Sequence, residues 1–172
     1  MSFDNLVNRG INLVTTSGLL TAAGAVLTHD ATVTIGYSID GKFTTKAPIV
    51  AGTTPTTDVN TGVAFPILVG GGNTTPPTPG SGAVAVWGLI AGGTVVVAMG
   101  PATALDLQGN FLYAPQFPAI PDTMVPFAYQ VLKAGATASA TAIRFGASVW
   151  NAVGFTNVIQ NVMALPSRPQ VA

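Results

Sequence analysis

The chain has 172 residues, of which 48% are apolar and only 7% are charged. The six Lys and Arg residues balance six Asp residues, so the formal net charge is zero. The chain contains no Glu and no Cys. An ordinary soluble domain is about a quarter charged, so this chain either sits in a membrane or covers much of its surface with other protein. The missing Cys excludes disulfides and Cys-ligated zinc and fits assembly in a reducing cytoplasm. The few scattered cations cannot form a patch for nucleic acid.

Residues 1–28 are predicted to form an N-terminal arm. Phe3, Leu6 and Val7 are spaced to form the apolar side of one helical turn after Ser2. Such a terminus either frays or packs against a neighbouring subunit. Its apolar content favours the second interpretation, so these three side chains are candidate partner contacts.

Residues 29–69 form a hairpin region and contain the clearest strand signal. Apolar and polar or small residues alternate over 33–39, which is typical of a half-buried strand. Asp40-Gly41 then suits a type I′ turn, because both central residues need positive φ. A second strand through Lys46 completes the predicted β-hairpin. Residues 48–62 are rich in Thr, Pro and Gly and are predicted to be a loop, and 63–69 a short strand.

Residues 70–82 read as a Gly/Pro/Thr linker, the best candidate boundary between two parts. Residues 83–165 are predicted to be a β-sandwich or barrel, because short strands recur between turn signals. Residues 1–69 either form a separate domain or add strands to this second part, and 166–172 form an extended tail. The strands expected in the second part are 83–90, 94–99, 103–107, 127–133, 142–145 and 155–162.

One uncharged stretch, residues 83–104, is long enough for a membrane-spanning helix. Glycines interrupt it, its valines favour strands, and no Lys or Arg flanks it as membrane helices require. A β-hairpin turning at Gly92-Gly93 explains the same residues. No membrane association is therefore predicted.

The sequence offers few groups for catalysis or metal binding. His29 is the only His, and its neighbour Asp30 should point to the opposite face of a strand. Asp40 and Asp106 lie in predicted turns, where Asp caps local backbone groups. Gly70–Gly72 lacks the Lys-Ser/Thr that completes a phosphate loop. No catalytic residue, metal site or cofactor is predicted; an enzyme would require His29 or two Asp to converge in a cleft.

The aromatic side chains separate into two groups. Trp87, Phe127 and Tyr129 lie inside apolar strand patterns and are predicted to be core. Phe117 flanks prolines in a crossing segment, as Phe111 and Tyr113 do, and is predicted to make contacts. Exposed tryptophans beside polar groups, at Trp87 or Trp150, would instead favour a sugar-binding module.

Several segments resemble virion proteins of tailed bacteriophages. They are Phe127-Ala128-Tyr129 with the preceding residues 115–122 and the following Lys133-Ala134-Gly135, together with 145–151, 165–170 and the opening 6–13. The resemblance contains no catalytic motif and carries over no site residue. It implies a small β-rich structural protein of the kind that decorates or cements a capsid.

The sequence therefore predicts a non-enzymatic virion structural protein on the capsid surface, assembled in the host cytoplasm. Its expected partners are the major capsid protein and further copies of itself, in a symmetric homo-oligomer such as a trimer. The alternatives are a tail or fibre component and a carbohydrate-binding β-module. The residues expected to contact partners are Phe3, Leu6, Val7, Phe117, Ile120, Leu165 and Arg168.

Overall fold

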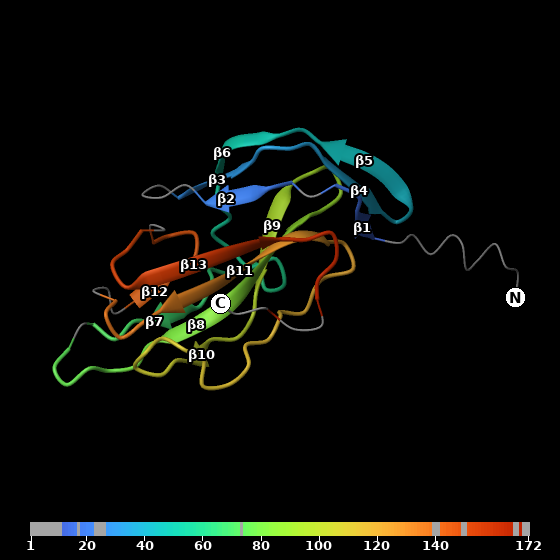
Figure 1. Cartoon of the computed structure of the whole chain (residues 1–172). Helices are drawn as coiled ribbons and strands as arrows, with labels where there is room; N and C mark the ends of the chain where they lie inside the picture. The colour runs from blue at the N-terminus through green and yellow to red at the C-terminus, as the bar shows by residue number, and fades with distance from the viewer. Residues whose placement is uncertain are drawn as a thin grey trace, which may run out of the picture.

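Figure 1 shows the protein as a computed structural model. The structure describes residues 12–16, 18–22, 27–72, 74–138, 142–148, 151–166 and Pro169. Every regular element in these residues is a β-strand, and the strands pair antiparallel in four sheets. The fold is all-β, as predicted, with sheets layered as in a sandwich, and the described strands close no barrel. No helix in these residues is long and apolar enough to cross a membrane.

The largest sheet has five strands in the order β10-β8-β11-β13, and β9 also pairs with β8. Its central strands, β8 and β11, are the longest in the fold, and β8 is buried in every residue after Ser81. A continuous apolar run of this kind is typical of a strand covered on both faces. The bounds are β8 Ser81–Leu89, β9 Val95–Met99, β10 Thr103–Ala104, β11 Val125–Ala134 and β13 Phe155–Asn161.

Three small sheets complete the fold. One has the order β1-β4-β5 and another β2-β3-β6, and in Figure 1 these two form a layer above the main sheet. The third pairs β7 with β12. The bounds are β1 Leu13–Val14, β2 Leu20–Ala22, β3 Thr28–Ala31, β4 Ile35–Ile39, β5 Lys42–Lys46, β6 Ile49–Thr53, β7 Ile67–Val69 and β12 Ala142–Arg144.

The predicted hairpin is confirmed as β4 and β5. Ile39 pairs with Lys42 across the turn, and Asp40 and Gly41 have φ of 51° and 73°. The predicted strands of the second part are found as β8, β9, β11, β12 and β13, with ends that differ by a few residues. The strand expected over 103–107 is shorter, because after β10 only an isolated bridge between Leu105 and Phe111 continues it.

The prediction of a loop over 48–62 was wrong at its beginning. Residues Ile49–Thr53 form β6, which pairs with β3 at the edge of its sheet. The run is short, follows Pro48 and contains Ala51 at φ 50°, a conformation rare for a residue with a Cβ. The segment therefore lacks the regular alternation of apolar and polar residues that predicts a strand. The segment predicted as an arm likewise contributes β1 and β2 to two sheets, while residues 1–11 lie outside the described residues.

The first face of the main sheet carries the principal core. Trp87 lies at its centre, 5.6 Å from the ring of Phe145, and its Nε1 donates to Gln130 Oε1 at 3.1 Å. Tyr37 of β4 and Leu20 of β2 belong to the same cluster. Residues on both sides of 70–82 therefore share one core, and Ser81 and Gly82, expected in the linker, begin β8.

The second face of the main sheet carries a smaller core. Val84 and Val86 of β8 and Tyr129 and Val131 of β11 point to this side. No described strand packs over it. The cover consists instead of irregular segments, whose contacting side chains are Val59, Phe111, Phe117, Ile120, Met124, Val162 and Leu165.

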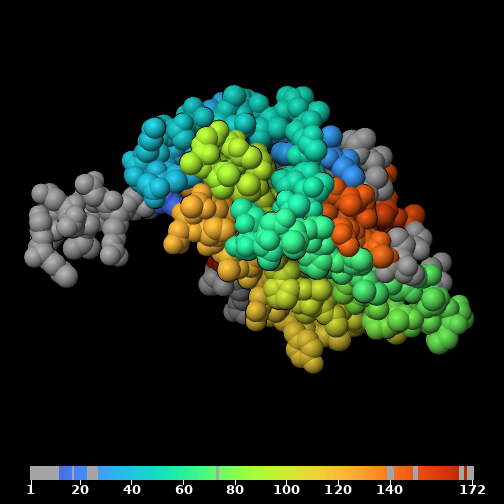
Figure 2. Space-filling view, turned by 180° about the vertical axis from the view of Figure 1, so that it is seen from behind, coloured from blue at the N-terminus to red at the C-terminus, as the bar shows by residue number. Residues whose placement is uncertain are grey.

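A buried carboxylate closes the free edge of β9. Asp58 Oδ2 accepts from the backbone N–H of Met99 at 2.7 Å, and Oδ1 accepts from that of Asn60 at 2.7 Å. Val59 then donates its N–H to the carbonyl of Val97 at 2.9 Å. Figure 2 shows the segment containing these residues, in green, running across this side of the molecule. Asp58 therefore attaches the 54–64 segment to the sheet.

Replacing Asp58 with Ala should destabilise the fold by about 3 kcal/mol, because two backbone donors lose a charged acceptor where water is largely excluded. Asp122→Ala, at an exposed turn, is the matched control and should cost less than about 0.5 kcal/mol. Urea unfolding of both variants measures the difference. Equal stabilities of the two variants would contradict the edge-closing role.

His29 lies between the two layers. Its ring centroid is 4.9 Å from that of Trp87, its side chain is 2% exposed, and within the described residues neither ring nitrogen has a hydrogen-bond partner. Burial lowers the pKa of His29 below its ordinary 6.5; Asp30 opposes this effect and Lys46 adds to it. The folded protein therefore holds a neutral imidazole against its core.

Stability should fall as the pH drops below 6.5, because the unfolded chain then takes up a proton that the folded chain refuses. The loss should reach up to about 1.4 kcal/mol for each pH unit until the lowered folded pKa is passed. Since His29 is the only His, the variant His29→Leu should show little change between pH 7 and 5.5. Unfolding curves with the same slope against pH in both proteins would contradict this assignment.

Candidate functional site

Three of the predicted contact residues come together in the structure. Phe117, Ile120 and Leu165 are half-buried, and all pack on the second face of the main sheet. The Phe117 ring meets Tyr129 edge-on, with centroids 5.2 Å apart and planes at 88°. These residues cover their own sheet, and their contact with a partner stays a prediction.

The other predicted positions are divided between the core and the undescribed residues. Phe3, Leu6, Val7 and Arg168 lie outside the described residues, as does Trp150. Trp87 is fully buried, as the apolar strand pattern predicted. Its indole is therefore closed to a ligand.

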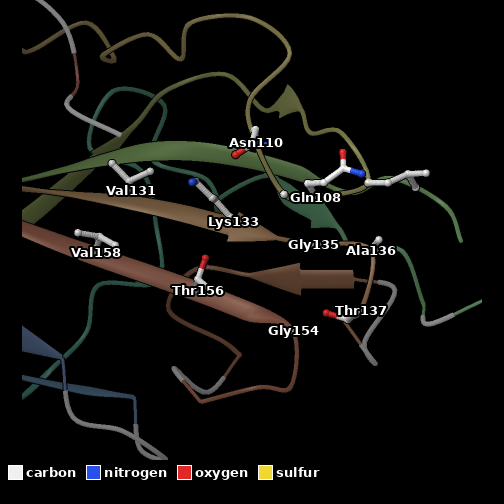
Figure 3. Close-up of a pocket in the computed structure, with 12 residues that line it drawn as sticks. Gln108, Asn110, Val131, Lys133, Gly135, Ala136, Thr137, Gly154, Thr156 and Val158 are labelled. Atoms are coloured by element: carbon white, nitrogen blue, oxygen red, sulfur yellow. The ribbon is translucent and has the colours of Figure 1, made fainter. Parts of the chain in front are cut away.

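A groove remains on the second face where the irregular cover ends. It follows the C-terminal half of β11 and the beginning of β13 and has a volume of about 540 Å³. Val131 pairs with Val158 and Lys133 with Thr156 across the two strands, so these four side chains form its floor. We call it the β11–β13 groove (Figure 3); it is lined by Leu107, Gln108, Gly109, Asn110, Val131, Lys133, Gly135, Ala136, Thr137, Gly154, Thr156 and Val158.

A capped turn forms one wall of the groove. Asp106 Oδ1 accepts from the N–H groups of Gln108 at 2.9 Å and Asn110 at 2.8 Å, and Oδ2 accepts from Asn110 Nδ2 at 3.0 Å. The backbone and side-chain amides of Asn110, followed by the N–H groups of Gln108 and Gly109, lower the pKa of Asp106 below its ordinary value. The capping role predicted for Asp106 is confirmed, and it directs Gln108 and Asn110 toward the groove.

The closed end of the groove is fixed by close backbone packing. Gly135 donates its N–H to the carbonyl of Gly154 at 3.1 Å. Gly154 has φ of 73°, and a Cβ there would come within 2.2 Å of the Ala138 nitrogen. Only Gly fits this position, so the end of the groove is rigidly defined.

Lys133 gives the groove its charge. It is the only charged residue in the lining, and its Nζ lies 5.4 Å from the centroid of the Phe111 ring. Figure 3 shows its side chain between Asn110 and Thr156. The lining thus combines the two floor valines with one ammonium, two amides and two hydroxyls. The lining residues include no carboxylate and no imidazole that could transfer a proton.

The sequence analysis did not single out this groove. Lys133 is the only charged residue between Asp122 and Arg144 and stands at the end of an apolar strand pattern. An isolated charge in such a run was the available signal. The turn at 108–110 and the strand that carries Lys133 were both predicted. Which of their side chains lie together depends on the register of the strands.

A second hollow of about 480 Å³ lies where the β4–β5 hairpin meets the turn between β8 and β9. Figure 2 shows these two segments side by side, in blue and yellow-green. Asp40 and Lys42 line it together with Tyr37 and Thr44. Across the described residues, no three His or Asp side chains gather as a metal site would require.

Comparison with known proteins finds no family model, no curated protein and no solved structure that matches this chain. Its function is therefore inferred from the geometry of the molecule and from the sequence resemblance.

Asn110→Ala should raise the pKa of Asp106 toward 3.8, the ordinary value for Asp, because the carboxylate loses a side-chain donor. Asn60→Ala removes a comparable amide that donates to Ala119 elsewhere on the surface and should leave the Asp106 pKa unchanged. Carboxyl ¹³C NMR titration reports both. An unchanged Asp106 pKa in Asn110→Ala would show that the side chain does not hold this wall.

Proposed function

We propose that this protein is a non-enzymatic structural component of a tailed-phage virion, which decorates or cements the capsid as a symmetric homo-oligomer such as a trimer. The observation that carries the proposal is the character of the surface. Among the described residues, eleven large apolar side chains are exposed, and Phe43, Val50, Tyr113 and Val153 are each more than 60% exposed. A protein with so few charges and so many exposed apolar groups gains by covering this surface with other protein.

The sheet edges support assembly in the same way. Among the described strands, β6 pairs only with β3 and β13 only with β11, and neither β6 nor β13 contains a charged residue. Proteins that remain alone usually protect such edges with Lys, Pro or a bulge. Here β5 carries two Lys and the pairing of β6 with β3 is bulged between His29 and Ala31, so β13 is the described edge that lacks such protection. The major capsid protein and further copies of the chain are the proposed partners.

The alternative of a carbohydrate-binding module has weaker support. Sugar sites on β-scaffolds use exposed aromatic rings, whereas Trp87 is buried and holds Gln130 within the core. A tail or fibre position remains the second location to distinguish, because it would use the same kind of surface.

Cryo-electron microscopy of whole particles should show this chain on the outside of the icosahedral shell, at symmetry axes or between capsomers. Purified protein should form one defined oligomer, measured by light scattering or native mass spectrometry. Density in the tail would replace capsid decoration with a tail role. Absence from the particle, together with a monomer in solution, would overturn the proposed function.

A further inference from the structure

We propose that the β2-β3-β6 sheet is a pH-sensitive cover, which opens away from the main sheet when His29 is protonated and exposes the apolar face around Trp87. Figure 1 shows the closed form, and the open form is populated in mildly acidic solution. This inference goes beyond the proposed function and does not depend on it.

His29 is enclosed in the contact between the two layers. Its side chain extends from β3 toward β8, where its ring centroid lies 4.9 Å from that of Trp87. On its own sheet the backbone of Gly52 packs against the ring, because a Cβ at Gly52 would lie 2.9 Å from both Cε1 and Nε2 of His29. The side chain is 2% exposed. Water and counter-ions therefore have little access to the imidazole while the sheet stays in place.

The charges around His29 do not compensate a proton on its ring. Strands β2, β6 and β8, which surround it, contain no charged residue. Asp30 follows it on β3 and points to the other face of the sheet, where its carboxylate accepts from the N–H of Ala51 at 2.6 Å. The charge of Asp30 favours protonation, but burial has the larger, opposite effect, and Lys46 of β5 adds to that effect. A proton on His29 would therefore be buried without adequate compensation in the closed form.

The β2-β3-β6 sheet can move without breaking a strand ladder of the main sheet. Its three strands pair with one another in a sheet of their own. The side chain of Asn161 on β13 joins the two sheets, because it accepts from the N–H of Leu20 at 2.6 Å and donates to the Leu20 carbonyl at 3.4 Å. Apolar side chains, including those of Leu20 and Ala31, add to this contact. Opening therefore costs side-chain contacts and leaves the strand pairings of the main sheet intact.

A second polar group is buried beside this sheet. Thr54 directly follows β6 and is 2% exposed, and within the described part of the chain its Oγ1 has no hydrogen-bond partner. The same is true of both ring nitrogens of His29. Water would restore hydrogen bonds to these atoms once the sheet opened. Apolar contact therefore holds the closed form against unsatisfied polar groups, and a charge on His29 shifts the balance toward the open form.

The pH range of the opening follows from the two states of His29. In the open form the imidazole is in water and has its ordinary pKa of 6.5, whereas burial lowers its pKa in the closed form. Below this ordinary pKa, each pH unit favours the open form by up to about tenfold, until the lowered pKa of the closed form is passed. At higher pH the ring is neutral in both forms and the sheet stays closed.

Labelling of an introduced Cys tests the opening, because the chain has no native Cys. Ala31→Cys places a thiol under the sheet, and Ala98→Cys places one in the core of the second face, which the opening leaves covered; both alanines are fully buried. After correction for thiol ionisation, Ala31→Cys should react on the order of tenfold faster at about pH 5 than at about pH 7. At the lower pH it should also react faster than Ala98→Cys. An Ala31→Cys rate that does not change with pH, or equal rates of the two variants at the lower pH, would overturn the proposal.

Two further substitutions assign the effect to His29. Adding His29→Leu to Ala31→Cys removes the titrating group and should make the labelling rate independent of pH. Adding Ala22→Asp instead supplies an acceptor, because Ala22 pairs directly with His29 across β2 and β3 and opposite Cβ atoms lie about 5 Å apart. Val50→Asp, at an exposed position of β6, is the matched control and should keep the acid response. An acid response that survives His29→Leu or Ala22→Asp would contradict the assignment.

Trp87 provides a measurement without a substitution at the contact. In full-length Trp150→Phe it is the only Trp, and the opening exposes its indole to solvent. Acrylamide quenching of its fluorescence should therefore increase at the lower pH, while circular dichroism keeps the β-sheet signal. Unchanged quenching would overturn the proposal even if the Cys variants failed to fold. Quenching that increases only as the β-sheet signal is lost would also overturn it, since the whole chain would then be unfolding.

Discussion

The whole structure depends on one constraint, which is that the two central strands of the main sheet are apolar on both faces. Trp87 and its neighbours on one side of β8, and Val84 and Val86 on the other, are excluded from water. Leaving either face open would expose several large apolar side chains, each worth about 1.5–3 kcal/mol of burial. The remaining parts of the chain are arranged as two covers for this sheet.

The two covers differ in structure: strands cover the first face, and irregular segments cover the second. On the first face, strands of the small sheets supply Tyr37 and Leu20 and enclose His29. On the second face, irregular segments lie over the sheet without pairing along it, and past Phe111 the cover ends and leaves the β11–β13 groove. An apolar sheet face closed only in part by its own chain is suited to being completed by another protein. The proposed structural assembly would account for the groove and the low charge together.

Local patterns in the sequence were sufficient for the fold class and for most strands. The hairpin was predictable because Asp40-Gly41 suits its turn. Strand β8 was predictable because valines favour strands and glycines interrupt the run as a helix. β6 was missed because it begins a segment rich in Thr, Pro and Gly, a composition that predicts a loop. The groove could not be predicted, because Lys133 and Thr156 meet only through the register of two strands separated in sequence. Apolar residues near prolines indicated contact at Phe117, but the pattern could not specify which surface it would meet.

The central claim is that assembly completes the cover of the second face. The most direct test is hydrogen exchange of backbone amides in residues 105–111 and 153–160, measured across a range of protein concentrations. The account predicts that exchange there slows as the oligomer forms, while exchange in the exposed strand β5 does not change. An oligomer that forms without slower exchange in either segment would contradict the claim, because assembly would then leave the second face as open as it is in the single chain.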